Sequence, residues 1–86
     1  MLITAEQVLA MKPCSEYTEE IIRANHGEHG ITPREIAELD IPIGDRVWVV
    51  GQLVPVNVWA EIQRLYTDFS EELQALLKYI EEQDST

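Results

Sequence analysis

Hydrophobic residues recur at three- and four-residue spacings along most of the chain, between signals that begin and end helices. Thr4 opens the first such segment with a capping box, and Ser15 is the natural N-cap of the second. Thr32, followed by Pro33 and by Glu35 of a second capping box, gives the clearest start signal, for a third segment. These patterns predict short helices at 5–12, 16–25 and 33–39.

The C-terminal third, from Pro55 onward, shows the longest amphipathic pattern. Its apolar positions are Val58, Ile62, Leu65, Phe69, Leu73, Leu76 and Ile80. This periodicity predicts one long helix at 56–83, which would be about 40 Å long at about 1.5 Å per residue. Because Ser70 could cap a new helix, a kink near 67–70 stays open.

The stretch "GDRVWVVGQLVPVNVW" at 44–59 is the most apolar part of the chain, and its pattern allows two structures. Valine and tryptophan favour strands, so a hairpin at 46–58 would give an α+β fold. Pro55 argues against this hairpin because it removes a donor from the second strand. The helical alternative spans 45–53, with Asp45 as its N-cap. Residue propensity alone leaves both structures open.

Three segments, "ITAEQVL", "PCSEYTEE" and "LDIPIGDRVW", together resemble a group of small proteins from phages and mobile elements with the pattern "T.EQVL…PC..YT…LDIP..DR.W". The resemblance covers about residues 3–60 and weakens through the C-terminal helix. The chain departs from the group at Val49 and Val50, where Leu or Ala is more usual, and in the histidines of "NHGEHG".

This resemblance implies that "DRVW" opens a short helix and that the protein works in a viral or mobile-element setting. We therefore expect an all-α fold and a single domain over residues 1–86. In this fold four short helices pack on the long C-terminal helix.

Charge narrows the classes of function. Sixteen Asp and Glu against six Lys and Arg give the 86 residues a formal net charge of −10 and a pI near 4.4. Without a run of Lys and Arg, direct binding to nucleic acid or to an anionic membrane is not expected. An acidic surface suits a basic protein or nucleoprotein complex as partner, although charge also serves solubility alone. No segment resembles a signal peptide or a spanning helix, which predicts a protein of the host cytoplasm.

Little in the chain resembles catalytic or metal-binding chemistry. Neither a glycine-rich phosphate loop nor a Ser, His and Asp order typical of hydrolases is found, so we expect no enzyme and no cofactor. His26 and His29 of "HGEHG" are each followed by a glycine and, with Cys14, are too few for a zinc site, so we expect an exposed loop and no metal. For Cys14, the only cysteine, a structural thiol fits better than a nucleophile, which would need a positioned base.

Two functions follow, and they use different residues. The first is an inhibitor of a host nucleic-acid-handling complex, of the anti-CRISPR kind, whose carboxylates occupy a groove meant for nucleic acid. The expected partner-binding residues are Asp68, Glu71, Glu72, Glu81 and Glu82 on the long helix, then Glu16, Glu19 and Glu20, with Trp59 as an apolar anchor. The alternative is a structural or assembly protein, a homodimer whose interface buries Leu65, Phe69, Leu73, Leu76 and Ile80.

Overall fold

The computed structural model describes residues 2–13 and 16–84, and this part of the chain is mostly helical. The helices are α1 (Ala5–Ala10), α2 (Glu19–His26), α3 (Pro33–Ala37), α4 (Ile43–Gly51), α5 (Val56–Leu65) and α6 (Phe69–Asp84). The described residues form no strand. An isolated bridge, in which Ile3 and Ile31 exchange backbone hydrogen bonds of 2.7 and 3.0 Å, ties the start of the chain to the loop after α2. The predicted all-α class is confirmed.

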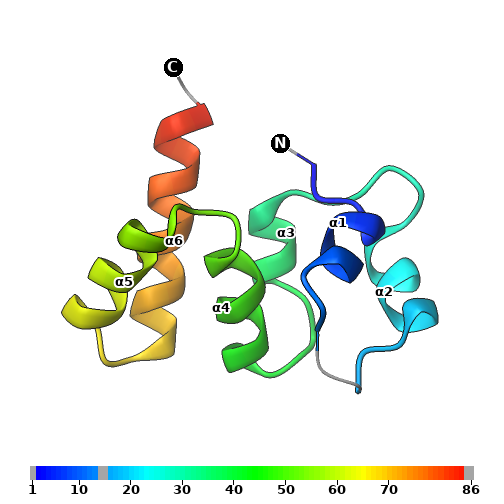
Figure 1. The fold of residues 1–86 in the computed structure, drawn as a ribbon, viewed down its shortest axis with the longest axis horizontal. Coiled ribbons are helices and arrows are strands. Elements are labelled where there is room, and N and C mark those ends of the chain that lie inside the picture. Colours follow the sequence, from blue (N-terminus) through cyan, green and yellow to red (C-terminus); the bar gives the residue numbers. More distant parts are fainter. Residues whose placement is uncertain (1, 14–15, 85–86) are drawn as a thin grey trace.

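Consecutive helices pack as three pairs that stand side by side across the molecule (Figure 1). The α1–α2 pair lies at one end, the α5–α6 pair at the other, and α3 and α4 lie between them. α6 packs on α4 as well as on α5, and also contacts α3. α4 therefore lies between the two outer pairs with α6 packed on it, and the extents of the molecule are 35 × 29 × 21 Å.

Capping boxes begin α1 and α3, as the sequence predicts. At α3, Thr32 Oγ1 accepts a hydrogen bond from the backbone amide of Glu35 at 3.1 Å. Glu35 Oε1 in turn accepts from the backbone amide of Thr32 at 3.0 Å. These contacts satisfy amides that a helix start otherwise leaves without partners.

α2 begins three residues later than predicted. Thr18 is its N-cap, and the Thr18 side chain accepts from the amide of Ile21 at 3.3 Å. The expected cap, Ser15, lies outside the described residues. Because α2 starts late, Glu16 and Tyr17 lie in the turn before the helix rather than in its first turn.

The apolar stretch at 44–59 is helical on both sides of a short break, so the alternative hairpin at 46–58 is wrong. α4 begins directly after Pro42, whose carbonyl accepts from the amide of Arg46 at 3.2 Å. Asp45 is therefore not the N-cap: a proline with φ fixed near −52° already sets the chain into the helix. Asp45 lies in the first turn instead, and α4 ends at Gly51 rather than at 53.

Two helices, α5 and α6, occupy the segment expected to be one helix at 56–83. Tyr66 adopts extended backbone, with φ −122° and ψ 131°, and ends α5. Asp68 Oδ1 then accepts from the amides of Ser70 at 2.7 Å and Glu71 at 3.4 Å, so Asp68 caps α6. The break overlaps the region 67–70, where the sequence pattern allows a kink. Its consequence is that α6, about 24 Å long, folds back on α5 instead of projecting.

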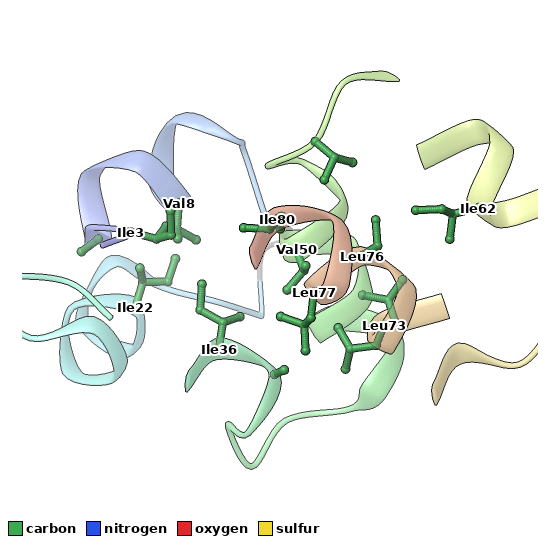
Figure 2. Close-up of a cluster of buried hydrophobic side chains, with 14 residues drawn as sticks. Ile3, Val8, Ile22, Ile36, Val50, Ile62, Leu73, Leu76, Leu77 and Ile80 are labelled. Carbon is green, nitrogen blue, oxygen red and sulfur yellow. The ribbon is translucent and has the colours of Figure 1, made fainter. Parts of the chain in front are cut away.

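A cluster of buried aliphatic side chains joins the three pairs (Figure 2). Val8 and Ile22 contribute from α1 and α2, and Ile36 of α3 lies between them and the side chains of α4 and α6. Val50 and Leu76 have no exposed surface at all. Burying an aliphatic side chain of this size stabilises a fold by about 1.5–3 kcal/mol, so these contacts hold the α1–α2 pair to the rest.

Candidate functional site

The acidic side chains all lie in the described part of the chain, and all of them are exposed except Asp45 and Glu72. Most of the arginine and lysine side chains already bond to other groups of the protein. Arg23, Arg34 and Arg64 pair with glutamates, while Arg46 donates to the carbonyl of Ala37 at 2.7 Å. The surface field is therefore negative, because these pairs use only a few of the exposed carboxylates.

Glu72 is not part of an exposed acidic face, contrary to the prediction. It is 6 % exposed, and its Oε1 accepts a hydrogen bond from Trp59 Nε1 at 3.0 Å. Asp68 is exposed, but its carboxylate caps α6. Two of the predicted partner-binding carboxylates on the C-terminal helices thus have structural partners.

The outer face of α6 is mixed in charge. Glu81 forms an ion pair with Arg34 of α3, which links the two helices. Glu71 and Glu82 are exposed, and Lys78 lies between them in sequence, lining one shallow hollow with each. The structure therefore does not bring Glu71, Glu81 and Glu82 together as a row of unpaired carboxylates.

The acidic residues near α2 fall into two kinds. Glu19 pairs with Arg23 at 2.9 Å, and Arg23 also contacts Glu6 of α1 at 2.6 Å. The hydrogen bond from Arg23 holds the pKa of Glu6 below its ordinary value, and the two carboxylates raise the pKa of Arg23. Glu16 and Glu20 are exposed, and the described residues give them no ion pair.

Trp59 is half-buried and packs inside the fold. A Cβ built on Gly51 would lie only 2.3 Å from Trp59 Cε2, so the indole covers the backbone of α4 at this glycine. With its nitrogen held by Glu72, the side chain connects α4, α5 and α6. An apolar anchor for a partner, as predicted from the sequence for Trp59, would instead be exposed on the surface.

Much of the apolar stripe expected to form a homodimer is internal. Leu73, Leu76 and Ile80 are at most 4 % exposed and belong to the core. Leu65 and Phe69 remain, 62 % and 53 % exposed. The described surface thus retains two residues of the five, because α6 folds back on α4 and α5.

A cavity of about 460 Å³, which no sequence pattern predicts, lies between the α1–α2 pair and the α3–α4 pair. Tyr17, Asp45 and Trp48 line it. They come from the segments "PCSEYTEE" and "LDIPIGDRVW", which are far apart in sequence and meet here. Trp48 belongs to the apolar stretch at 44–59, and no local signal in the sequence joins Tyr17 to Asp45.

The histidines do not share a site. His26 ends α2 and is buried, contrary to the expected exposed loop, while His29 is exposed in the turn that follows. His26 Nδ1 donates to the carbonyl of Ile3 at 2.9 Å, since a carbonyl can only accept. The described part of the chain holds no group of three or more potential metal ligands, and Cys14 lies outside it.

Comparisons with family models, with curated proteins and with solved structures find no match to this chain. Among the helices of residues 2–13 and 16–84, none has both the length and the apolar composition needed to cross a membrane.

Proposed function

We propose that the protein is an acidic binding protein of a phage or mobile element that inhibits a host nucleic-acid-handling complex. The observation that carries the proposal is the exposure of every acidic side chain except Asp45 and Glu72, in a chain of net charge −10. Opposite fields speed the encounter with a basic partner and help to exclude wrong ones. In this mechanism the carboxylates occupy a groove that otherwise binds nucleic acid. The resemblance to phage and mobile-element proteins supports the setting.

Of the predicted partner-binding carboxylates, four support this proposal best, because they are exposed and the described residues give them no ion pair. They are Glu16 and Glu20 near the start of α2, and Glu71 and Glu82 on α6. A carboxylate already paired with arginine offers less to a partner, since its charge is neutralised locally.

The experiment is capture of the host complex on the immobilised protein, followed by competition with duplex DNA. We expect a nucleic-acid-handling complex to be retained at low salt and released by the duplex, because both ligands would occupy one basic groove. Retention that duplex DNA does not reverse, or capture without any such complex, would contradict the proposal.

Matched variants separate a binding site from bulk charge. Glu16→Gln with Glu20→Gln, and Glu6→Gln with Glu61→Gln, each remove two negative charges. The second pair removes carboxylates that already contact arginines. We expect the first double variant to weaken retention by about tenfold and the second by much less, as for charges that meet a partner directly. Equal weakening would leave only net charge as the cause.

A further inference from the structure

The cavity between the α1–α2 and α3–α4 pairs has an apolar floor. Val8, Ile22 and Ile36 line it, and each is at most 4 % exposed. Leu39 and Trp48 also line it and are half-buried. Its volume of about 460 Å³ lies within the range typical of ligand sites, about 300–1,000 Å³. The space exceeds that of one side chain and suits an apolar group with a polar end.

Acceptors without full sets of partners line the same cavity. The Tyr17 hydroxyl donates to Asp45 Oδ2 at 2.5 Å, and the described residues offer no partner to the other oxygen, Oδ1. His26 is 5 % exposed; its Nδ1 is bonded to Ile3, and its Nε2 has no partner among the described residues. Neither atom is among the fully buried side-chain atoms that lack a partner, so both keep some accessible surface and can accept from a ligand that brings N–H donors.

We infer that the cavity receives an arginine side chain of the basic partner, together with an apolar residue beside it. The inference rests on the proposed function and names the contact by which the partner is held. A guanidinium carries five donors in a plane, so one group can bind Asp45 and also stack on Tyr17 or Trp48. A lysine ammonium is more strongly hydrated and does not stack in this way.

The two charged residues that line the cavity have opposite signs, and the half-buried one, Asp45, attracts a cation. Asp45 lines the cavity, and Glu16, the residue before Tyr17, is exposed. Lys12 also lines the cavity and is exposed, and its charge opposes a bound cation. A bound anion would instead be attracted by Lys12 and repelled by Asp45. The substitution Lys12→Gln therefore has opposite effects on the two kinds of ligand.

The test uses three tripeptides, N-acetyl-Leu-X-Leu-amide with X arginine, lysine or citrulline, and the full chain. Citrulline keeps the shape of arginine and removes its charge. Binding is followed by the amide chemical shifts of the chain. We expect the arginine peptide to bind with chemical-shift changes centred on Tyr17, Asp45 and Trp48. The citrulline peptide should bind at least about tenfold more weakly, as expected for the loss of a part-buried charge pair.

Two variants of the cavity give the sharper readout. Asp45→Asn keeps an acceptor for Tyr17 and removes the charge, and it should weaken the arginine peptide about tenfold. Lys12→Gln changes an exposed side chain and should tighten the same peptide about twofold to threefold. If Asp45→Asn fails to fold, as judged by circular dichroism, the Lys12→Gln variant and the citrulline peptide still test the inference. Equal binding of arginine and citrulline, or weaker binding to Lys12→Gln, would overturn the inference.

The experiments distinguish failure of the proposed function from failure of the inference about the cavity. If the arginine peptide binds the cavity but no nucleic-acid-handling complex is captured, the cavity specificity stands and the inhibitor proposal falls. If such a complex is captured and Asp45→Asn and Trp48→Leu retain it as well as the native chain does, the complex uses the acidic surface alone and the inference about the cavity falls.

Discussion

Trp59 Nε1 donates a hydrogen bond to Glu72 Oε1 at 3.0 Å, and this contact joins α5 to the first turn of α6. The same indole lies against Gly51 of α4. One side chain therefore fixes the mutual positions of the three helices that surround the C-terminal core. The buried carboxylate is placed at the N-terminal end of α6, where the helix dipole stabilises negative charge.

The first prediction concerns the acceptor for Trp59. Glu72→Ala leaves the indole nitrogen without its partner and should lower the free energy of unfolding by about 2 kcal/mol, the usual size for a hydrogen bond to a charged group. Glu72→Gln keeps an acceptor oxygen and should lose less. Urea denaturation measures all three proteins. Glu71→Ala, at the exposed neighbouring position, is the control and should stay within about 0.5 kcal/mol of the native chain. Equal losses at 71 and 72 would show that the contact contributes nothing.

The second prediction compares two glycines of α4. At Gly51 an added Cβ would lie 2.3 Å from the Trp59 ring, and at Gly44 it would meet Phe69 at an ordinary 3.5 Å. Gly51→Ala should therefore destabilise the fold by about 1–3 kcal/mol through overpacking. Gly44→Ala should be neutral or raise stability by about 0.5 kcal/mol, because alanine loses less backbone entropy in a helix. The thermal unfolding midpoints of the two variants should move apart, and a common shift for both would refute the packing argument.

Local signals were enough to predict where α1 and α3 begin. Thr4 and Thr32 head the capping boxes that the sequence predicts, because each box involves residues only three positions apart. The apolar stretch needed more: its valines and tryptophans favour strands, and the helix of α4 is stabilised by burial of Val47 and Val50 in the core. Tertiary packing overrides a propensity that spans only about 1 kcal/mol.

The break before α6 and the burial of Glu72 were harder to predict. The apolar spacing continues through 66–68, so periodicity alone does not separate α5 from α6. Glu72 lies one turn before Leu76 and so on the buried face, a signal that the spacing contained. What makes its burial tolerable is Trp59, thirteen positions earlier, and that partner comes close only when the two helices fold back on each other.

The cavity depends on contacts that are still more distant in sequence. Tyr17 and Asp45 are 28 positions apart, and their hydrogen bond exists because the α1–α2 pair packs beside α4. No pattern within one helix encodes that packing. The exposed carboxylates Glu16 and Glu20 could be named from the sequence, since exposure is the usual state of an acidic side chain.

The third prediction tests a cap that the sequence already suggested. Thr32→Ala removes the acceptor for the amide of Glu35 and should cost about 1 kcal/mol of stability, the usual value for a lost N-cap. Thr32→Ser keeps a hydroxyl acceptor and should recover most of that loss. Thr67→Ala, at an exposed position between α5 and α6, is the matched control and should change stability by less than about 0.5 kcal/mol. A loss at Thr67 as large as at Thr32 would contradict a specific role for the cap.

The fourth prediction concerns the pH dependence of the contact between α1 and α2. The hydrogen bond from Arg23 to Glu6 holds the pKa of Glu6 below its ordinary value, and the Glu6 backbone amide adds to this effect. Because the folded pKa lies below the unfolded one, the pair stabilises the fold at neutral pH, and this stabilisation is lost as the pH falls through the folded pKa. Both side chains are exposed, so the contribution is small and should shrink further in high salt.

Nuclear magnetic resonance titration of the Glu6 carboxyl measures this pKa directly. In Arg23→Gln the pKa of Glu6 should rise part of the way toward its ordinary value, since the backbone amide remains as a donor. Arg64→Gln, which removes a different exposed arginine paired with Glu61, is the control and should leave the Glu6 titration unchanged. A Glu6 midpoint that is the same with and without Arg23 would mean that the ion pair contributes nothing to the contact between α1 and α2.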